Sequence, residues 1–126
     1  MKKLMLLLFL LISTIGIAQT KTKVPGSDNI IYTLDKTEEK PELLGDMTFD
    51  QYFKKNFHVT EKMSEPLTIL FTVEKVGLAL DIHVAKDVGA GAGKEAIRVI
   101  KSAPKWKPGK INGKIVRVLY RYTVQN

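Results

Sequence analysis

Cysteine is absent from the sequence of 126 residues, and histidine occurs only twice. The absence of cysteine excludes disulfides, thiolate metal sites and thiol nucleophiles, so the fold must rely on its apolar core. His58 and His83 fit neither of the zinc-binding spacings H-E-x-x-H and H-x-x-E-H. His83 is expected to be a solvated side chain on a strand. We therefore expect no metal and no cofactor.

Other catalytic patterns are also missing. No serine lies in a G-x-S-x-G elbow, and the acidic pair Glu38–Glu39 falls in a polar stretch that would not desolvate it. The glycine-rich stretch at 87–100, DVGAGAGKEAIRVI, does not fit a Walker loop, because Val88 and Glu95 stand where glycine and a hydroxyl residue are needed. A dinucleotide loop would need glycine in place of Lys94. We read the stretch as a flexible strand-to-helix connection, and we expect no enzyme.

The N-terminus has the three parts of a secretory signal. A basic start, Met1 to Lys3, precedes an apolar run, and Gly16 to Ala18 supplies the small residues that a signal peptidase reads. We predict a signal peptide over residues 1–18, cleaved after Ala18. The alternative is a retained membrane anchor, although the 15 residues from Leu4 to Ala18 fall short of the ~20 that a span needs.

Residues 19–47 are mostly polar, and only two short runs, at 30–32 and 43–44, have the character to pack. We predict a polar tether with one short extended segment. The formal net charge of the chain is +7 at pH 7. Export would separate such a protein from nucleic acid, so acidic protein segments, envelope polymers or anionic lipid head groups are better candidate partners.

Apolar periodicity divides residues 48–126 into helices and strands. A helix is predicted from Thr48, an N-cap candidate with Gln51 three positions on, and its aromatic face should pack in the core. A hairpin follows, with strands that begin at Leu67 and Leu78 and a turn at Gly77. In its second strand we expect one buried face, formed by Leu80, Ile82 and Val84.

A second helix is predicted over residues 94–103, where Pro104 stops it, and a last alternating strand over 115–124. The order helix, strand, strand, helix, strand indicates an α+β fold. We expect a three-stranded antiparallel sheet with two helices on one face. The strand at 67–73 should be central, because the intervening helix lets the last strand return beside it, which gives the strand order 2-1-3.

The C-terminal residues carry a specific pattern. A helix end of the form (S/A)-x-P-x-W-x-P-(G/A) occupies residues 102–109, Asn112-Gly113 lies in the basic loop that follows, and Val116-Arg117-Val118 opens a strand. This pattern resembles the C-terminal domain of the TonB family of energy transducers, with a likeness over about residues 41–124. The resemblance implies a domain over residues 48–126 that lies in the periplasm and binds protein without catalysis.

The resemblance also implies a partner and a site. The partner would be the TonB box, a peptide segment of an outer-membrane TonB-dependent receptor. An edge strand would accept it by strand addition, since unpaired N–H and C=O groups can pair with an extended peptide. Seven residues of the last strand are the candidate partner-binding site: Val116, Arg117, Val118, Leu119, Tyr120, Arg121 and Tyr122. Arg117 and Arg121 would pair with acidic residues near the box or, alternatively, only guard the edge against aggregation.

Two other functions stay open. A membrane-anchored minimal transducer would work with motor-complex proteins, but the 27 residues from Lys21 to Met47 reach only about 90 Å when fully extended. An envelope polymer such as peptidoglycan is the other candidate partner, with a sugar stacked on the tryptophan of a basic loop. Its candidate residues are Lys105, Trp106, Lys107, Lys110 and Lys114. Core packing of Trp106 is the alternative, and the sequence does not indicate the oligomeric state.

Overall fold

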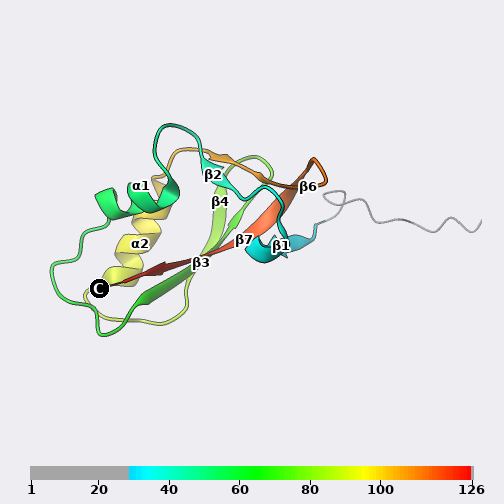
Figure 1. Ribbon diagram of the computed structural model, residues 1–126. Coiled ribbons are helices and arrows are strands. Elements are labelled where there is room, and N and C mark those ends of the chain that lie inside the picture. The colour runs from blue at the N-terminus through cyan, green and yellow to red at the C-terminus, as the bar shows by residue number, and fades with distance from the viewer. Residues whose placement is uncertain (1–28, 126) are drawn as a thin grey trace, which may run out of the picture.

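The computed structural model describes residues 29–125 and shows an α+β fold (Figure 1). The predicted signal peptide at 1–18 and the first part of the predicted tether lie outside the described residues. The elements, in chain order, are β1 (Ile31–Thr33), the 3-10 helix η2 (Leu34–Lys36), β2 (Glu42–Leu43), α1 (Phe49–Asn56), β3 (Leu67–Val73), β4 (Ala79–Val84), α2 (Ala92–Lys101), β5 (Trp106–Lys107), β6 (Gly109–Ile111) and β7 (Lys114–Val124). Neither α-helix of the described part is long and apolar enough to cross a membrane.

The main sheet has five strands in the order β1-β7-β3-β4, and β6 pairs with β7 as a hairpin. The three strands expected from the sequence are present, with β3 between β4 and β7 and both pairs antiparallel. The expectation of a purely antiparallel sheet of three strands is wrong, because β1 adds a parallel strand to β7. β1 corresponds to the short extended segment expected in the tether, but its pairing with β7 was not predicted, because three residues are too few to indicate which strand they join.

Both helices contribute to one core on the same side of the sheet (Figure 1). The cap of α1 is as predicted, since Gln51 N donates to Thr48 Oγ1 at 3.2 Å and Thr48 N donates to Gln51 Oε1 at 3.1 Å. Phe49 and Phe53 of this helix are buried against the inward-facing side chains of β3. A cap and an aromatic face thus fix where α1 begins and which side faces the sheet.

Strand β4 is not the regular alternating strand that its sequence predicts. Asp81 has φ 51°, and the register of β4 against β3 shifts at this point, which marks a β-bulge. The extra residue reverses the faces on its N-terminal side, so that Ala79 packs against the core and Leu80 is 47% exposed. The expected inward face is therefore correct for Ile82 and Val84 but wrong for Leu80.

The second half of the predicted tether belongs to the folded unit. β1 pairs with residues 117–119 of β7, and β2 pairs with β5. Between them, the N–H groups of Glu38 and Glu39 donate to Lys110 O at 3.1 Å. Leu43 is buried in the core. From residue 31 onward, this part of the chain is held by the sheet rather than hanging as a loose tether.

The β3–β4 turn meets β5 at Gly77. Gly77 has φ 84°, and a Cβ atom at this position would lie 2.5 Å from Trp106 O, so only glycine fits. Trp106 N donates to Gly77 O at 2.8 Å. This contact fixes Trp106 beside the start of β4.

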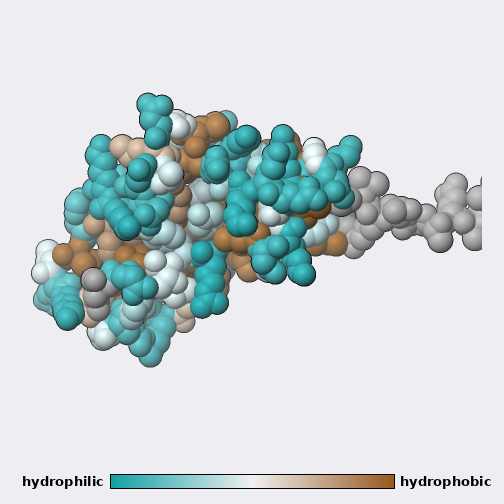
Figure 2. Space-filling model, in the orientation of Figure 1, coloured by the Kyte–Doolittle hydropathy of each residue, from teal (hydrophilic) through white to brown (hydrophobic). Residues whose placement is uncertain are grey.

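The face of the molecule that Figure 2 shows is mainly hydrophilic, with small and separate hydrophobic areas.

Candidate functional site

The side chains of β7 alternate between the core and the opposite face of the sheet. Val116 and Val118 are fully buried, and Tyr120 and Tyr122 pack against the core in partly buried positions. Four of the seven candidate partner-binding residues therefore hold the fold through their side chains. A partner that pairs with β7 would meet these four residues mainly through their backbone.

The direction of each backbone group in β3 follows from two hydrogen bonds. Glu74 N donates to Leu78 O at 2.8 Å, and Ala85 N donates to Thr68 O at 3.0 Å. The backbone groups of even-numbered residues in this stretch thus point towards β4. Because successive residues of a strand point their N–H and C=O groups to opposite sides, the odd-numbered residues of β3 point towards β7.

The register of β3 and β7 then identifies the outer edge of β7. Ile69 lies opposite Tyr122, so Tyr122 and the other even-numbered residues of this part of β7 point towards β3. Four residues point their N–H and C=O groups to the outer edge instead: Arg117, Leu119, Arg121 and Thr123. The sequence alone could not show which residues these are.

This outer edge is half covered. β1 pairs with it at residues 117–119, and η2, which directly follows β1 in the chain, also contacts β7. No strand of the described part of the chain pairs with the outer edge beyond Leu119. The backbone groups of Arg121 and Thr123 therefore form a short open edge, and both residues are exposed. We refer to residues 120–124 as the β7 edge.

Arg117 is already engaged within the molecule. Its Nε and Nη2 atoms donate to the two carboxylate oxygens of Glu74, each at 2.8 Å, and Nη1 donates to Asn29 O at 3.0 Å. The hydrogen bonds to Glu74 raise the pKa of the Arg117 guanidinium, so its charge is held by this pair. The expectation that Arg117 is free to contact a partner does not fit this geometry. This pairing was not predicted, because Glu74 lies 43 residues away from Arg117 along the chain.

Arg121 differs from Arg117 because it is exposed and forms no ion pair with any residue in the part that the structure describes. Its side chain lies on the sheet face away from the helices, next to the open backbone groups. A cation beside an open strand edge favours a peptide with an acidic side chain at the matching position. Arg121 is thus the free charge of the candidate site.

Strand β7 is tied to helix α1 near the β7 edge. Tyr122 Oη donates to Asp50 Oδ1 at 2.6 Å, and Lys54 forms an ion pair with the same carboxylate at 2.9 Å. The hydrogen bond from Tyr122, followed by that from Lys54, lowers the pKa of Asp50. Burial, followed by the bond to Asp50, raises the pKa of Tyr122. These contacts hold the strand in place without using its outward backbone groups.

The candidate polymer-binding residues do not form the expected stacking site. Trp106 is 2% exposed, and its ring packs against Phe49, Phe71 and Tyr120 with centroid distances of 5.0–5.6 Å. Its faces are covered by protein, as the core-packing alternative predicts, and cannot stack on a sugar in this conformation. The four lysines around it, Lys105, Lys107, Lys110 and Lys114, lie at least partly exposed.

The glycine-rich stretch also has a structural role. Gly91 has φ 65° and is the N-cap of α2, and Glu95 in the first turn accepts hydrogen bonds from Arg98 and from the backbone N–H of His58. These bonds, that from Arg98 first, lower the pKa of Glu95 to about 2. The carboxylate of Glu95 thus places a negative charge at the first turn of α2, where a bound phosphate would need a positive field.

Within residues 29–125, no three His, Asp or Glu side chains are grouped to hold a metal.

Comparison with known proteins shows a weak likeness in structure and none in sequence. No family model matches the chain, and no curated protein matches its sequence. Among solved structures, the chain is similar to the solution NMR structure of the TonB C-terminal domain of Pseudomonas aeruginosa, with 18% identity and a TM-score of 0.40. The likeness covers 75% of this chain and 92% of that one.

Proposed function

We propose that this protein is a non-enzymatic binding module that accepts an extended peptide by strand addition at the β7 edge. The observation that carries the proposal is the outward direction of the Arg121 and Thr123 backbone groups, which no strand among the described residues pairs. Backbone pairing supplies affinity in such complexes, and side-chain contacts set register and specificity. The exposed guanidinium of Arg121 favours an acidic residue in the peptide.

The identity of the peptide comes from the sequence pattern at residues 102–118. Its resemblance to the TonB C-terminal family supports a TonB-box segment of an outer-membrane receptor as the partner. The predicted signal peptide supports a periplasmic location, where such a segment would be met. Mass spectrometry of the mature protein tests the location, since an N-terminus at Gln19 supports export by cleavage and one at Met1 supports the anchored transducer.

β1 supports the capacity of this edge to pair. It occupies the outer edge of β7 at residues 117–119 in parallel orientation, so an extended segment already uses the same row of backbone groups. A peptide bound at residues 120–124 would lie next to β1 in the same row. A longer peptide would need to replace β1, and the module would then open its own edge as it binds.

Proline at Arg121 tests the pairing. Arg121→Pro removes an N–H that points outward and not to β3, so the fold should survive, as proline is tolerated on edge strands. Binding of a synthetic TonB-box peptide, followed by amide chemical shifts of β7, should be lost. Arg121→Ala is the matched control, because it keeps the N–H and removes the charge, and it should weaken binding only modestly and mainly at low salt. Shifts confined to residues 105–114, or no shifts at all, would refute the proposal.

A further inference from the structure

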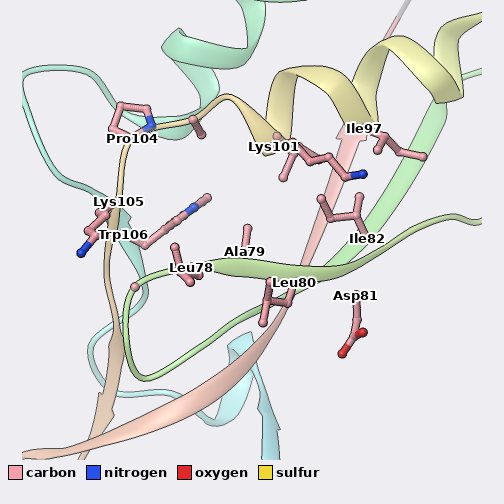
Figure 3. Close-up of a pocket in the computed structure, with 13 residues that line it drawn as sticks. Leu78, Ala79, Leu80, Asp81, Ile82, Ile97, Lys101, Pro104, Lys105 and Trp106 are labelled. Atoms are coloured by element: carbon pink, nitrogen blue, oxygen red, sulfur yellow. The ribbon is translucent and has the colours of Figure 1, made fainter.

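A second feature lies on the opposite edge of the sheet, away from the β7 edge. A groove of about 600 Å³ separates the outer edge of β4 from the C-terminal half of α2 (Figure 3). Its apolar lining comes from both walls and includes Leu78, Ala79, Ile82, Ile97, Ile100 and Pro104. A smaller hollow, lined by Val84, Lys94 and Ile97, continues it along the same helix. We call the two together the β4–α2 groove.

One wall of the groove is an open strand edge. β4 is the last strand of the sheet and pairs only with β3 among the described residues. By the alternation described above, the backbone groups of Ala79, Ile82 and Val84 point away from β3 and towards this edge. The bulge at Asp81 interrupts the row, so a regular strand can pair with it on one side of the bulge at a time.

The floor of the groove holds a buried hydrogen-bond donor with no acceptor. The indole ring of Trp106 extends from β5 into the space between β4 and α2 (Figure 3). Its Nε1 atom is buried and has no hydrogen-bond partner among the described residues. Buried side-chain donors nearly always have a hydrogen-bond partner, so an unsatisfied donor in the floor of a groove indicates a place for an acceptor atom of a ligand.

The helical wall of the groove is cationic. Lys101 is exposed and forms no ion pair with any of residues 29–125, and its side chain lies along the groove towards Ile82 (Figure 3). Lys94, two turns earlier on α2, is exposed beside the continuing hollow. The carboxylate of Asp81 points away from the groove (Figure 3). Asp87 also lines the continuing hollow, where its carboxylate accepts a hydrogen bond from Gly89 N at 2.9 Å. The two lysines of α2 thus leave a net positive charge on the side of the groove that a bound segment would meet.

We propose that the β4–α2 groove binds an extended, acidic peptide segment of a partner protein. An extended backbone fits the open edge of β4, apolar side chains fit the lining, and carboxylates pair with Lys94 and Lys101. An oxygen of the segment would accept the hydrogen bond of Trp106 Nε1. Charge argues against a second copy of this chain as the occupant, because the protein carries a formal net charge of +7. Residues 19–28 do not fit either, since they carry two lysines and one aspartate.

The test uses the single tryptophan of the chain, which gives one indole N–H signal in an NMR spectrum. The probe is an acetylated and amidated peptide of eight residues that alternates valine with glutamate, titrated into the full-length protein labelled with ¹⁵N. We expect the indole signal to move downfield as Nε1 gains an acceptor, together with the amide signals of Ala79, Ile82 and Val84. A peptide with glutamine in place of glutamate should bind more weakly.

Charge reversal at Lys101 supplies the matched comparison. Lys101→Glu should weaken binding of the glutamate peptide about three- to tenfold, and added salt should reduce the difference. Lys55→Glu should leave binding unchanged, because Lys55 is also an exposed lysine in the last turn of a helix, α1, and lies outside this groove. The control makes the same change in net charge and in helix-end electrostatics.

Several results would overturn the proposal. An unmoved indole signal, equal affinity for the glutamine peptide, or equal effects of the two lysine variants would each refute an acidic ligand in this groove. If the amide signals of β4 move with increasing protein concentration in the absence of peptide, the occupant of the groove is a second copy of the chain instead. Shifts at Arg121 and Thr123 alone would place the peptide at the β7 edge, which refutes this inference and leaves the proposed function intact.

Discussion

Release of β1 should strengthen peptide binding at β7. Tyr32 is the middle residue of β1 and lies opposite Val118 in the register. Its backbone therefore lies between the outward-pointing backbone groups of Arg117 and Leu119. Tyr32→Pro removes the N–H of this residue and should detach β1 from the edge. Tyr32→Ala is the matched control, since it shortens the side chain but keeps the N–H.

The size of the effect follows from how weakly β1 is held. It has only three residues, and both of its ends are exposed, with Ile31 at 42%. Ordering three residues costs roughly 3–6 kcal/mol. The hydrogen bonds between β1 and β7, at about 0.5–1.5 kcal/mol each, and the partial burial of β1 offset this entropic cost with little excess stabilisation. We take the net stabilisation of β1 as about 0–2 kcal/mol, so its release should raise the affinity of a long peptide by up to about 30-fold.

Two measurements test this reasoning together. Amide hydrogen exchange at Leu119 should become faster in Tyr32→Pro than in the native protein and in Tyr32→Ala, because the outward N–H loses its cover. Titration with a TonB-box peptide long enough to span residues 117–124 should show tighter binding to the proline variant. Faster exchange without tighter binding would show that the peptide does not use this part of the edge. Weaker binding would show that β1 belongs to the site and does not compete for it.

Three further changes test the fold that supports the site. Trp106→Ala should lower the free energy of unfolding by about 3–5 kcal/mol in denaturant titration, since the ring is buried among aromatic neighbours, and a change below ~1 kcal/mol would contradict its core role. Glu74→Ala should cost about 1–3 kcal/mol because it leaves Arg117 without its bidentate partner, and adding Arg117→Ala should restore part of the loss. The pKa of Glu95 is lowered from 4.5 in the unfolded chain to about 2 in the folded protein, so its ionised carboxylate stabilises the fold. This stabilisation is complete above pH 4.5 and should disappear as the pH falls towards about 2. Thermal unfolding of Glu95→Gln should lack this part of the pH dependence, and an unchanged pH profile would contradict the assignment.

The regular elements of the fold could be predicted because each of them repeats a pattern over several residues. The cap at Thr48, the turn at Gly77 and the central position of β3 are confirmed. The strands β1, β2, β5 and β6 have two or three residues each and gave no period to detect. Their positions depend on long-range pairing, which only the folded chain shows.

The candidate site was predicted at the level of its strand and not of its atoms. The direction of each backbone group on β7 depends on the register with β3, which a single residue of slip would reverse. The pairing of Arg117 with Glu74 depends on the same register. The bulge at Asp81 turns the side chain of Leu80 to the exposed face of the sheet. The sequence around Asp81 still alternates apolar and polar residues, so the bulge could not be predicted from it.

The alternation along β7 has a consequence for how such a module can diversify. Its even-numbered side chains build the core, and its odd-numbered side chains lie on the opposite face next to the backbone groups that would pair with a peptide. Substitutions at Arg121 or Thr123 can therefore change which peptides are preferred without repacking the interior. Substitutions at Tyr120 or Tyr122 affect folding first. Among descendants of this chain, odd and even positions of one strand would accumulate changes at different rates, so partner choice could drift while the scaffold is inherited unchanged.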